Sequence, residues 1–449
     1  MKAKKPNQPI SRRHFMKNTT YGLTGAALLP TLLPSCTNWK GANDRIQIGH
    51  IGVGSRGGAE LKSYYLPLEG SRSVAICDLF KDRREKGAEY ANRYYKDNEI
   101  SAPKSTAYHQ YEEILERSDI DAVNITTTDH WHVLAAIRAA EAGKHVMLAK
   151  PLGLSYPNYL KLKKALKDND VRFHYGTQQR AAQHMQMGID MIQQGKIGEI
   201  ERVEVWAPGK NDVQSPHCIE TPVPEGFDYE KWIGPAPMAP YCPERVTNNG
   251  SWFNNDYSIG FLAGWGAHPL DIMIWGMKEK LSGNYSCEGS GTIWPGDGLY
   301  NNVFSWDLKY QYENGIEVHF LSSGQAEKKI MNHRTLSDNN KTTFYGSKGW
   351  ISLGRSAVES DIKEIDDKLN AASKDSKGMG QLFLDVIRGE REEACPLEDA
   401  ILSDTISHMG NMAIRMNRKI GWDPIKGKTV NDPEANKLFV REMREPYQI

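Results

Sequence analysis

A short stretch of the chain carries the apolar run Ile46-Gln47-Ile48-Gly49-His50-Ile51, followed at once by Gly52-Val53-Gly54-Ser55-Arg56-Gly57. A second apolar run, Val74-Ala75-Ile76-Cys77, ends in Asp78. The pattern G-x-G-x-x-G is weak evidence alone. Here it follows a strand pattern, precedes a helix-compatible segment and has an acidic residue 21 positions after Gly57. In this context the pattern predicts a dinucleotide-binding site at a strand-to-helix turn.

Each glycine of this turn has a separate expected role. Gly52 permits the tight turn, Gly54 lets the backbone approach a pyrophosphate, and Gly57 lets the helix pack closely on the strand. Ser55 and Arg56 begin the helix, whose unpaired N–H groups bind phosphate oxygens. Asp78 would accept hydrogen bonds from the adenosine ribose and repel a 2′-phosphate, which favours NAD over NADP. The alternative is a Gly-rich turn of another α/β protein, with Asp78 as an ordinary strand-end carboxylate.

Composition and charge restrict the class of protein. The 449 residues are 39% hydrophobic and 25% charged, which is typical of a globular chain with room for two domains and extensions. The chain has 56 basic and 56 acidic residues, so no global field favours nucleic acid or an anionic membrane. A small neutral partner fits this balance better.

The first 36 residues resemble a targeting segment. Ser11-Arg12-Arg13-His14-Phe15-Met16-Lys17 precedes the moderately apolar stretch 21–33, which is the twin-arginine pattern of bacterial export. The apolar stretch is too short for a permanent membrane span. Leu33-Pro34-Ser35-Cys36 resembles a lipobox, so Cys36 is a candidate lipid attachment site. We therefore expect a periplasmic protein, with membrane contact only through such an anchor.

The other cysteines are scattered along the chain and form no C-x-x-C pair. Their spacing predicts neither a disulfide framework nor a zinc site. Cys77 lies on an apolar strand pattern and is most simply a core residue. The remaining members are Cys218, Cys242, Cys287 and Cys395.

Strand and helix patterns alternate from residue 45 to 156, which predicts a doubly wound parallel sheet, an NAD-binding Rossmann domain. Ligands of such sheets bind at the carboxyl ends of the strands, so the loops 126–130 and 149–153 should face the cofactor. Residues 157–449 predict an α+β domain with an open, mainly antiparallel sheet that binds substrate and mediates oligomerisation. The Pro-rich segment 215–245 suits a long ordered loop over a site, and the polar run 370–380 a loop.

Several motifs together resemble the Gfo/Idh/MocA oxidoreductase family, typified by glucose-fructose oxidoreductase and inositol dehydrogenase. The similarity runs from Arg45 to the C-terminus. It rests on Gly52 to Gly57, Thr127-Thr128-Asp129-His130-Trp131-His132, Ala142-Gly143-Lys144-His145-Val146, Lys150-Pro151 and Gly264-Trp265-Gly266-Ala267-His268-Pro269-Leu270-Asp271.

The resemblance implies NAD bound by the Gly52 loop, Thr127, His130, Trp131, His132, Lys150 and Pro151. Gln178, Gln179, Arg180 and Trp265 offer the hydrogen bonds and stacking surface that sugars favour, and with His268 and Asp271 of the second-domain motif they are the expected substrate contacts. Two positions depart from the family pattern. The usual Glu-Lys-Pro is Ala149-Lys150-Pro151 here, and the Asp usually found four residues before the histidine is Gly264, while His268 remains.

Oxidation of an alcohol needs a group that accepts the hydroxyl proton. Lys150 could be this base, since the positive nicotinamide and desolvation would both lower its pKa. His268 could be the base itself or relay the proton. In the alternative readings Lys150 only hydrogen-bonds a ligand, and His268 is a histidine at a helix start. Asp129, His130 and His132 could in principle ligate a metal, but such close spacing at a turn rarely converges on one ion, and we predict no metal site.

Two enzymatic hypotheses follow. The first is an NAD-dependent oxidoreductase acting on a secondary hydroxyl of a sugar or glycoside, with tightly held cofactor because the periplasm offers no NAD pool. The second is a redox-neutral glycosidase that oxidises a sugar hydroxyl to a ketone, eliminates the aglycone, adds water and reduces the ketone again. A third hypothesis is a binding protein whose catalytic site is inactive, because Ala149 and Gly264 replace two acidic residues of the family pattern. We favour the first and expect a homo-oligomer.

Overall fold

The computed structural model describes residues 45–210, 214–329, 340–372 and 378–449. The expected export leader and Cys36 lie outside these residues. Within the described segments, no helix combines the length and apolar character needed to cross a membrane.

The first sheet, which we call the parallel sheet, has the strand order β3-β2-β1-β4-β5-β6 among the described residues, and every neighbouring pair is parallel. Strands β2, β4 and β5 are buried along their whole length, as expected for a parallel sheet covered by helices on both faces. The doubly wound prediction is confirmed. The strands are β1 (Ile46–Ile51), β2 (Ser71–Cys77), β3 (Thr106–Tyr108), β4 (Ala122–Ile125), β5 (His145–Leu148) and β6 (Phe173–Tyr175).

Helices connect these strands. The glycine loop opens α2, which continues as a π-helical turn, and α5 is buried on nearly every face. The parallel sheet takes in β6, so it extends past residue 156, where the sequence pattern placed the end of the first domain. The helices are α2 (Ser55–Glu60), η2 (Leu61–Tyr65), α3 (Lys81–Asp97), α4 (Tyr111–Glu116), α5 (Asp129–Glu141) and α6 (Tyr156–Asp168).

The second sheet, the mixed sheet, has the order β13-β12-β11-β7-β10-β9-β8-β14-β15 in the described part of the chain. Only the pair β10 and β7 is parallel among its described pairs, so the expected open, mainly antiparallel sheet is confirmed. Its strands are β7 (Ile200–Ala207), β8 (Tyr285–Ile293), β9 (Val303–Tyr312), β10 (Glu317–Ser322), β11 (Lys341–Gly346), β12 (Gly349–Gly354), β13 (Val358–Ser360), β14 (Ile420–Asp423) and β15 (Lys428–Thr429).

Helix α15 joins the two sheets, because it contacts β6 of the parallel sheet and β8 of the mixed sheet. The polar run 370–380, expected as a loop, lies partly in helices α13 and α14, and residues 373–377 are outside the described part. The remaining helices are η3 (Gln178–Ala181), α7 (Gln183–Gln193), α8 (Tyr229–Ile233), η4 (Pro243–Val246), α9 (Asn248–Trp252), α10 (Phe261–Gly264), α11 (Ala267–Met277), η5 (Lys278–Lys280), α12 (Ser323–Lys329), α13 (Lys363–Ala371), α14 (Met379–Ile387), α15 (Leu397–Met416) and α16 (Pro433–Lys437).

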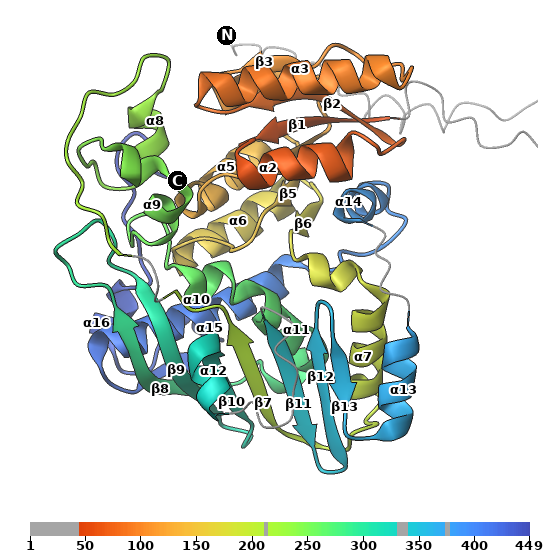
Figure 1. Ribbon diagram of the computed structural model, residues 1–449, viewed down its shortest axis with the longest axis vertical. Helices are drawn as coiled ribbons and strands as arrows, with labels where there is room; N and C mark the ends of the chain where they lie inside the picture. The colour runs from red at the N-terminus through yellow and green to blue at the C-terminus, as the bar shows by residue number, and fades with distance from the viewer. Residues whose placement is uncertain (1–44, 211–213, 330–339, 373–377) are drawn as a thin grey trace, which may run out of the picture. The chain divides into compact units, whose positions relative to one another are not determined.

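Residues 214–252 form a strap that carries α8 and α9 to the parallel-sheet domain (Figure 1). Phe80 and Phe227 stack with ring centroids 4.2 Å apart and also form an antiparallel bridge. Lys231 Nζ donates to Glu112 at 2.7 Å. The expected ordered loop over a site is therefore present.

A disulfide joins Cys218 to Cys242 within the strap. The spacing of the cysteines predicts no disulfide, and that prediction is wrong. The two residues are 24 positions apart, and only the folding back of the Pro-rich segment brings their Cα atoms to 5.6 Å. Cys77, Cys287 and Cys395 are free and buried, and Cys77 belongs to the core as predicted.

Candidate functional site

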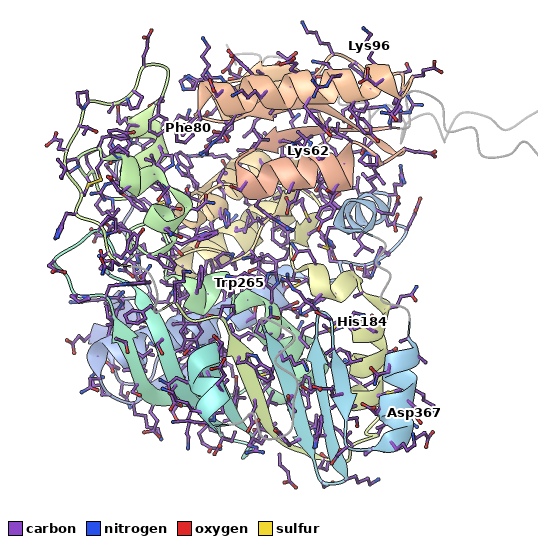
Figure 2. All side chains as sticks on the ribbon, viewed as in Figure 1. Lys62, Phe80, Lys96, His184, Trp265 and Asp367 are labelled. Atoms are coloured by element: carbon purple, nitrogen blue, oxygen red, sulfur yellow. A yellow bond between two sulfur atoms is a disulfide. The ribbon has the colours of Figure 1, made fainter. Side chains whose placement is uncertain are left out.

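A cavity of about 410 Å³ lies at the carboxyl ends of β1, β2, β4 and β5. The loops after these strands form one wall, and the strap with helices α10 and α11 forms the other. Trp265 lies between the two sheets, and Phe80 lies toward the strap (Figure 2). The site therefore sits where doubly wound folds bind ligands.

The glycine loop has the backbone that the sequence pattern requires. Gly52 has φ 86°, and a Cβ there would lie 2.5 Å from the Thr126 carbonyl oxygen. A Cβ on Gly57 would lie 2.1 Å from the Gly52 carbonyl oxygen, so only glycine lets the helix start this close to the strand. Gly54 precedes α2 and lines the cavity with Ser55 and Arg56. This cradle fits a dinucleotide pyrophosphate.

Asp78 ties the glycine loop to the end of β2. Its Oδ2 accepts from the Val53 N–H at 3.0 Å, and its Oδ1 accepts from the Phe80 N–H at 2.9 Å. Burial raises the pKa of this carboxyl group, although the two N–H donors act against that effect. The carboxylate lines the cavity at the position expected for ribose recognition.

Only some of the cofactor-binding residues predicted in the loop after β4 reach the cavity. Thr127 and Trp131 line the cavity, whereas His130 and His132 do not. His130 Nε2 donates to the Trp232 carbonyl at 3.1 Å, and burial lowers its pKa to about 4, so the ring is neutral. His132 lies between the carbonyls of Pro151, at 2.7 Å, and Thr127, at 3.2 Å. Both histidines therefore hold loops in place and do not border the cavity.

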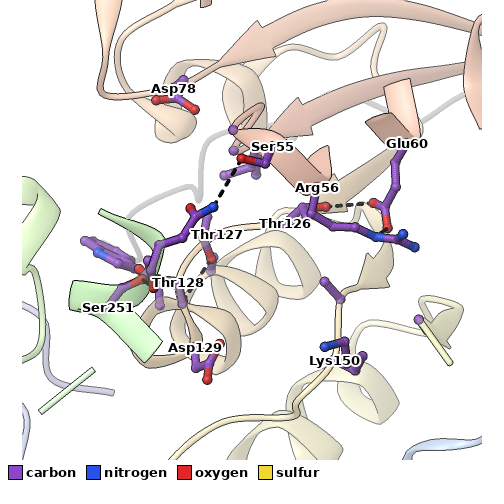
Figure 3. Close-up of a pocket in the computed structure, with 18 of the residues that line it drawn as sticks. Ser55, Arg56, Glu60, Asp78, Thr126, Thr127, Thr128, Asp129, Lys150 and Ser251 are labelled. Atoms are coloured by element: carbon purple, nitrogen blue, oxygen red, sulfur yellow. Dashed lines mark hydrogen bonds and ion pairs between the residues drawn. The ribbon is translucent and has the colours of Figure 1, made fainter. Parts of the chain in front are cut away.

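Lys150 is half-buried and faces the cavity across from Ser55 and Arg56 (Figure 3). Its Nζ donates to the Gly264 carbonyl oxygen and lies 5.9 Å from the centre of the Trp265 ring. Burial lowers the pKa of Lys150 to about 8, while Asp129 acts in the opposite direction. An amine with this pKa is a competent proton acceptor near neutral pH.

His268 lines the same cavity and is only 3% exposed. Its Nδ1 has no hydrogen-bond partner among the described residues, and burial followed by the charge of Lys150 lowers its pKa well below the usual value. The ring is therefore neutral. A Cβ on Gly264 would meet no atom within 4 Å, so the missing family aspartate leaves open space beside Lys150.

The residues expected to bind substrate fall into two groups. Gln178 and Trp265 line the cavity. Gln179 is buried and donates to Asn340 at 3.2 Å. Arg180 forms an ion pair with Asp271 at 2.6 Å, and the pair is almost fully buried. The turn η3 directs Gln179 and Arg180 into the core, and Asp271 meets Arg180 there from α11, so the structure does not bring these three side chains to the cavity.

Asp271, Asp256, His217 and Tyr257 are nearby side chains that could replace the missing aspartate, but none of them lines the cavity. Asp271 pairs with Arg180, and Tyr257 accepts a hydrogen bond from Arg245 at 3.2 Å. Asp256 lines a separate cavity, and His217 is exposed.

The cavity also holds residues that sequence reasoning missed. Glu60 accepts from Arg56 at 2.8 Å and from Thr126 at 2.9 Å, and Asn248 of the strap donates to Ser55 at 3.3 Å. Asp129 also lines the cavity, and its place in the motif Thr127 to His132 was the only local signal for it. Arg355 and Asn248 reach the cavity from distant segments of the chain. Within the described ranges, no three His, Cys, Asp or Glu side chains are grouped to hold a metal ion.

Two family models match the chain. "Oxidoreductase family, NAD-binding Rossmann fold" matches residues 46–177, and "Oxidoreductase family, C-terminal alpha/beta domain" matches residues 204–449. Both belong to the Gfo/Idh/MocA family and together they span most of the described residues.

Curated relatives match over a shorter range. A glycosyl hydrolase family 109 protein of Shewanella pealeana is 28% identical over 211 residues, which is 42% of this chain and 44% of that protein. An alpha-N-acetylgalactosaminidase of Shewanella oneidensis is 28% identical over 218 residues, with the same coverage of 42% and 44%. The chain therefore matches less than half the length of these relatives.

Solved structures share the fold at low sequence identity. An aldose-aldose oxidoreductase of Caulobacter crescentus has a TM-score of 0.59 at 15% identity, covering 84% of this chain and 100% of that chain. A WlbA dehydrogenase, solved with NADH and UDP-GlcNAcA, has a TM-score of 0.62 at 14% identity, covering 85% and 97%. With its glycine loop, its two sheets and both family models in agreement, the chain belongs to the Gfo/Idh/MocA oxidoreductase family.

Proposed function

We propose that the protein is an NAD-dependent oxidoreductase that acts on a secondary hydroxyl of a sugar or glycoside. The observation that carries this proposal is the amine of Lys150, with its pKa lowered to about 8, in the same cavity as the glycine loop. Bound NAD supplies the hydride acceptor. Lys150 Nζ accepts the hydroxyl proton while the C–H bond breaks, and the neutral His268 beside it can pass that proton on.

Gly52, Gly54, Ser55, Arg56 and Gly57 would hold the pyrophosphate. We assign NAD rather than NADP, because the Asp78 carboxylate in the cavity wall would repel a 2′-phosphate. Tight retention is supported by the strap, whose Lys231, Trp232 and Asn248 line the cavity opposite the cofactor loops.

Substrate recognition would fall to the aromatic end of the cavity. Trp252 and Trp265 line it together with Gln178, so rings for stacking and an amide for hydroxyl groups are present. Both departures from the family pattern, Ala149 and Gly264, also line this region and leave it without the usual acids.

A second candidate function is redox-neutral glycoside cleavage. It is favoured by the curated relatives, which are named as glycosyl hydrolase family 109 proteins and an alpha-N-acetylgalactosaminidase. Oxidation at one carbon would acidify the adjacent C–H, the aglycone would leave, water would add and the ketone would be reduced again. Lys150 and His268 would then share the proton transfers.

One experiment separates the two functions. The purified protein is denatured and any released nucleotide is identified, while intact protein is incubated with a panel of glycosides and NADH absorbance is followed. Stable NADH with a ketosugar product supports the oxidoreductase. Aglycone release without lasting NADH supports the glycosidase, and no reaction in a folded, NAD-loaded sample supports a binding protein.

We also propose export by the twin-arginine route, with Cys36 as a lipid attachment site, and a homo-oligomer formed through the open mixed sheet. The leader pattern at Arg12 and Arg13 supports export. A monomer in sedimentation at micromolar concentration would contradict the oligomer.

A further inference from the structure

The backbone that carries Lys150 is anchored by side chains of α6 and α15. Asp404 Oδ1 accepts from the Leu152 N–H at 3.4 Å, and Asp404 Oδ2 accepts from the Tyr159 hydroxyl. His408 Nε2 lies 3.1 Å from the Gly153 carbonyl oxygen. Asp404, Tyr159 and His408 are almost fully buried, so these contacts are made without competition from water.

The contacts of His408 Nε2 show that this nitrogen is a hydrogen-bond donor. Its Nε2 also lies 3.3 Å from Asp404 Oδ2 and 3.2 Å from the Tyr159 oxygen. A carbonyl and a carboxylate can only accept, so Nε2 must carry a hydrogen. The ring is further fixed by stacking on Phe439, with centroids 4.2 Å apart.

Close packing keeps the segment against α5 and α6. A Cβ on Gly153 would lie 2.9 Å from Val133 Cγ2 and 3.3 Å from Tyr159 Cε1. The opposite side of the segment is held as well, since His132 contacts the Pro151 carbonyl at 2.7 Å and Lys150 Nζ donates to the Gly264 carbonyl. Four consecutive residues are thus each anchored by a group from elsewhere in the fold.

We propose that Asp404, His408 and Tyr159 are positioning residues that hold the 150–153 backbone so that Lys150 Nζ stays against the Gly264 carbonyl at the reacting end of the cavity. They act on a proton acceptor without touching cofactor or substrate. The inference rests on the proposed function only in treating Lys150 as the base. A displacement of about 1 Å at a reacting group is enough to lower a rate by about a hundredfold.

The titration of Lys150 reports its position. Burial is the main cause of its lowered pKa, and the charged groups that face it are Asp129 and Glu60, which raise it, and Arg56 and Arg355, which lower it. The neighbouring His268 is neutral. A loosened 150–153 segment would let Nζ reach water, so the pKa of Lys150 would move up toward that of an exposed lysine.

The test compares His408→Leu, which removes the Nε2 donor, with His408→Gln, which retains a donor at a similar reach. Thr405→Val is the matched control, because Thr405 is equally buried on α15 but its hydroxyl donates only to the Ile401 carbonyl of the same helix. Acetylation of Lys150 by acetic anhydride is measured against pH by peptide mass spectrometry on the protein as purified. This readout needs no substrate.

The expected midpoint for the unchanged protein is near pH 8. His408→Leu should raise the acetylation midpoint of Lys150 by about one pH unit or more and lower kcat about tenfold or more. His408→Gln and Thr405→Val should leave the midpoint and kcat unchanged. If His408→Leu does not fold, Tyr159→Phe removes a single hydroxyl and should raise the midpoint in the same direction.

A loss of thermal stability in His408→Leu or Tyr159→Phe with an unmoved midpoint would overturn the proposal, since the cluster would then be structural only. If the unchanged protein oxidises no sugar but His408→Leu still raises the acetylation midpoint of Lys150, the positioning of Lys150 is upheld and its role as a base is refuted. The two failures are therefore distinguishable.

Discussion

Restoring an acid at Gly264 tests whether Lys150 is the base. Residue 264 ends α10, a Cβ there would meet no atom within 4 Å, and its carbonyl oxygen accepts from Lys150 Nζ. The Gly264→Asp side chain would therefore occupy open space beside the amine. An opposite charge this close favours the protonated form of a lysine.

The size of the effect follows from Coulomb's law. Two unit charges about 4 Å apart at an effective dielectric constant of about 20 interact by about 4 kcal/mol, an upper limit of about three pKa units. The pKa of Lys150 should then rise from about 8 by about one to three units. At pH 7 the neutral fraction of the amine would fall from about one in ten to about one in a hundred or less.

The assay is kcat/KM for sugar oxidation between pH 6 and 10. In the unchanged protein kcat/KM should rise with pH and level off above about 8. Gly264→Asp should shift the rise of kcat/KM to higher pH and lower kcat/KM at pH 7 about tenfold or more. The uncharged Gly264→Asn should leave the pH of this rise unchanged. Higher activity at pH 7 in Gly264→Asp would refute Lys150 as the base and favour the new carboxylate in that role.

Three further variants test other features of the structure. Removing the disulfide with Cys218→Ser and Cys242→Ser should lower the free energy of unfolding by about 3 kcal/mol in urea titration and speed release of bound NAD. Asp271→Asn should destabilise the fold by about 3 to 5 kcal/mol through the buried Arg180, with KM of the folded fraction unchanged. Asp78→Asn should weaken NAD binding about tenfold and narrow the preference over NADP, as measured by cofactor titration.

Each of these has a contradicting result. An NAD release rate that is the same with and without the disulfide would show that the strap does not retain the cofactor. A raised KM at unchanged stability in Asp271→Asn would place Asp271 at the substrate. Unaltered selectivity in Asp78→Asn would remove the basis for preferring NAD.

Local patterns predicted the first half of the molecule well. The strand Ile46–Ile51 has the expected bounds, and the expected run Val74–Cys77 lies within β2, because short apolar runs between turn residues are strands of a buried parallel sheet. Helix α15 gave no such signal. It is buried on nearly every face, so it has little of the one-sided periodicity that predicts a helix at a surface.

The cofactor end of the site was determined by the sequence itself. Gly52, Gly57 and Asp78 act through contacts inside one strand-turn-helix-strand unit, and their spacing alone brings them together. The substrate end was decided by tertiary structure. Adjacent residues Gln178 and Gln179 differ only in which way a short helical turn directs them, and the folding of α10 and α15 around the 150–153 segment determines where Lys150 lies. Such long-range contacts leave no periodic trace along the chain.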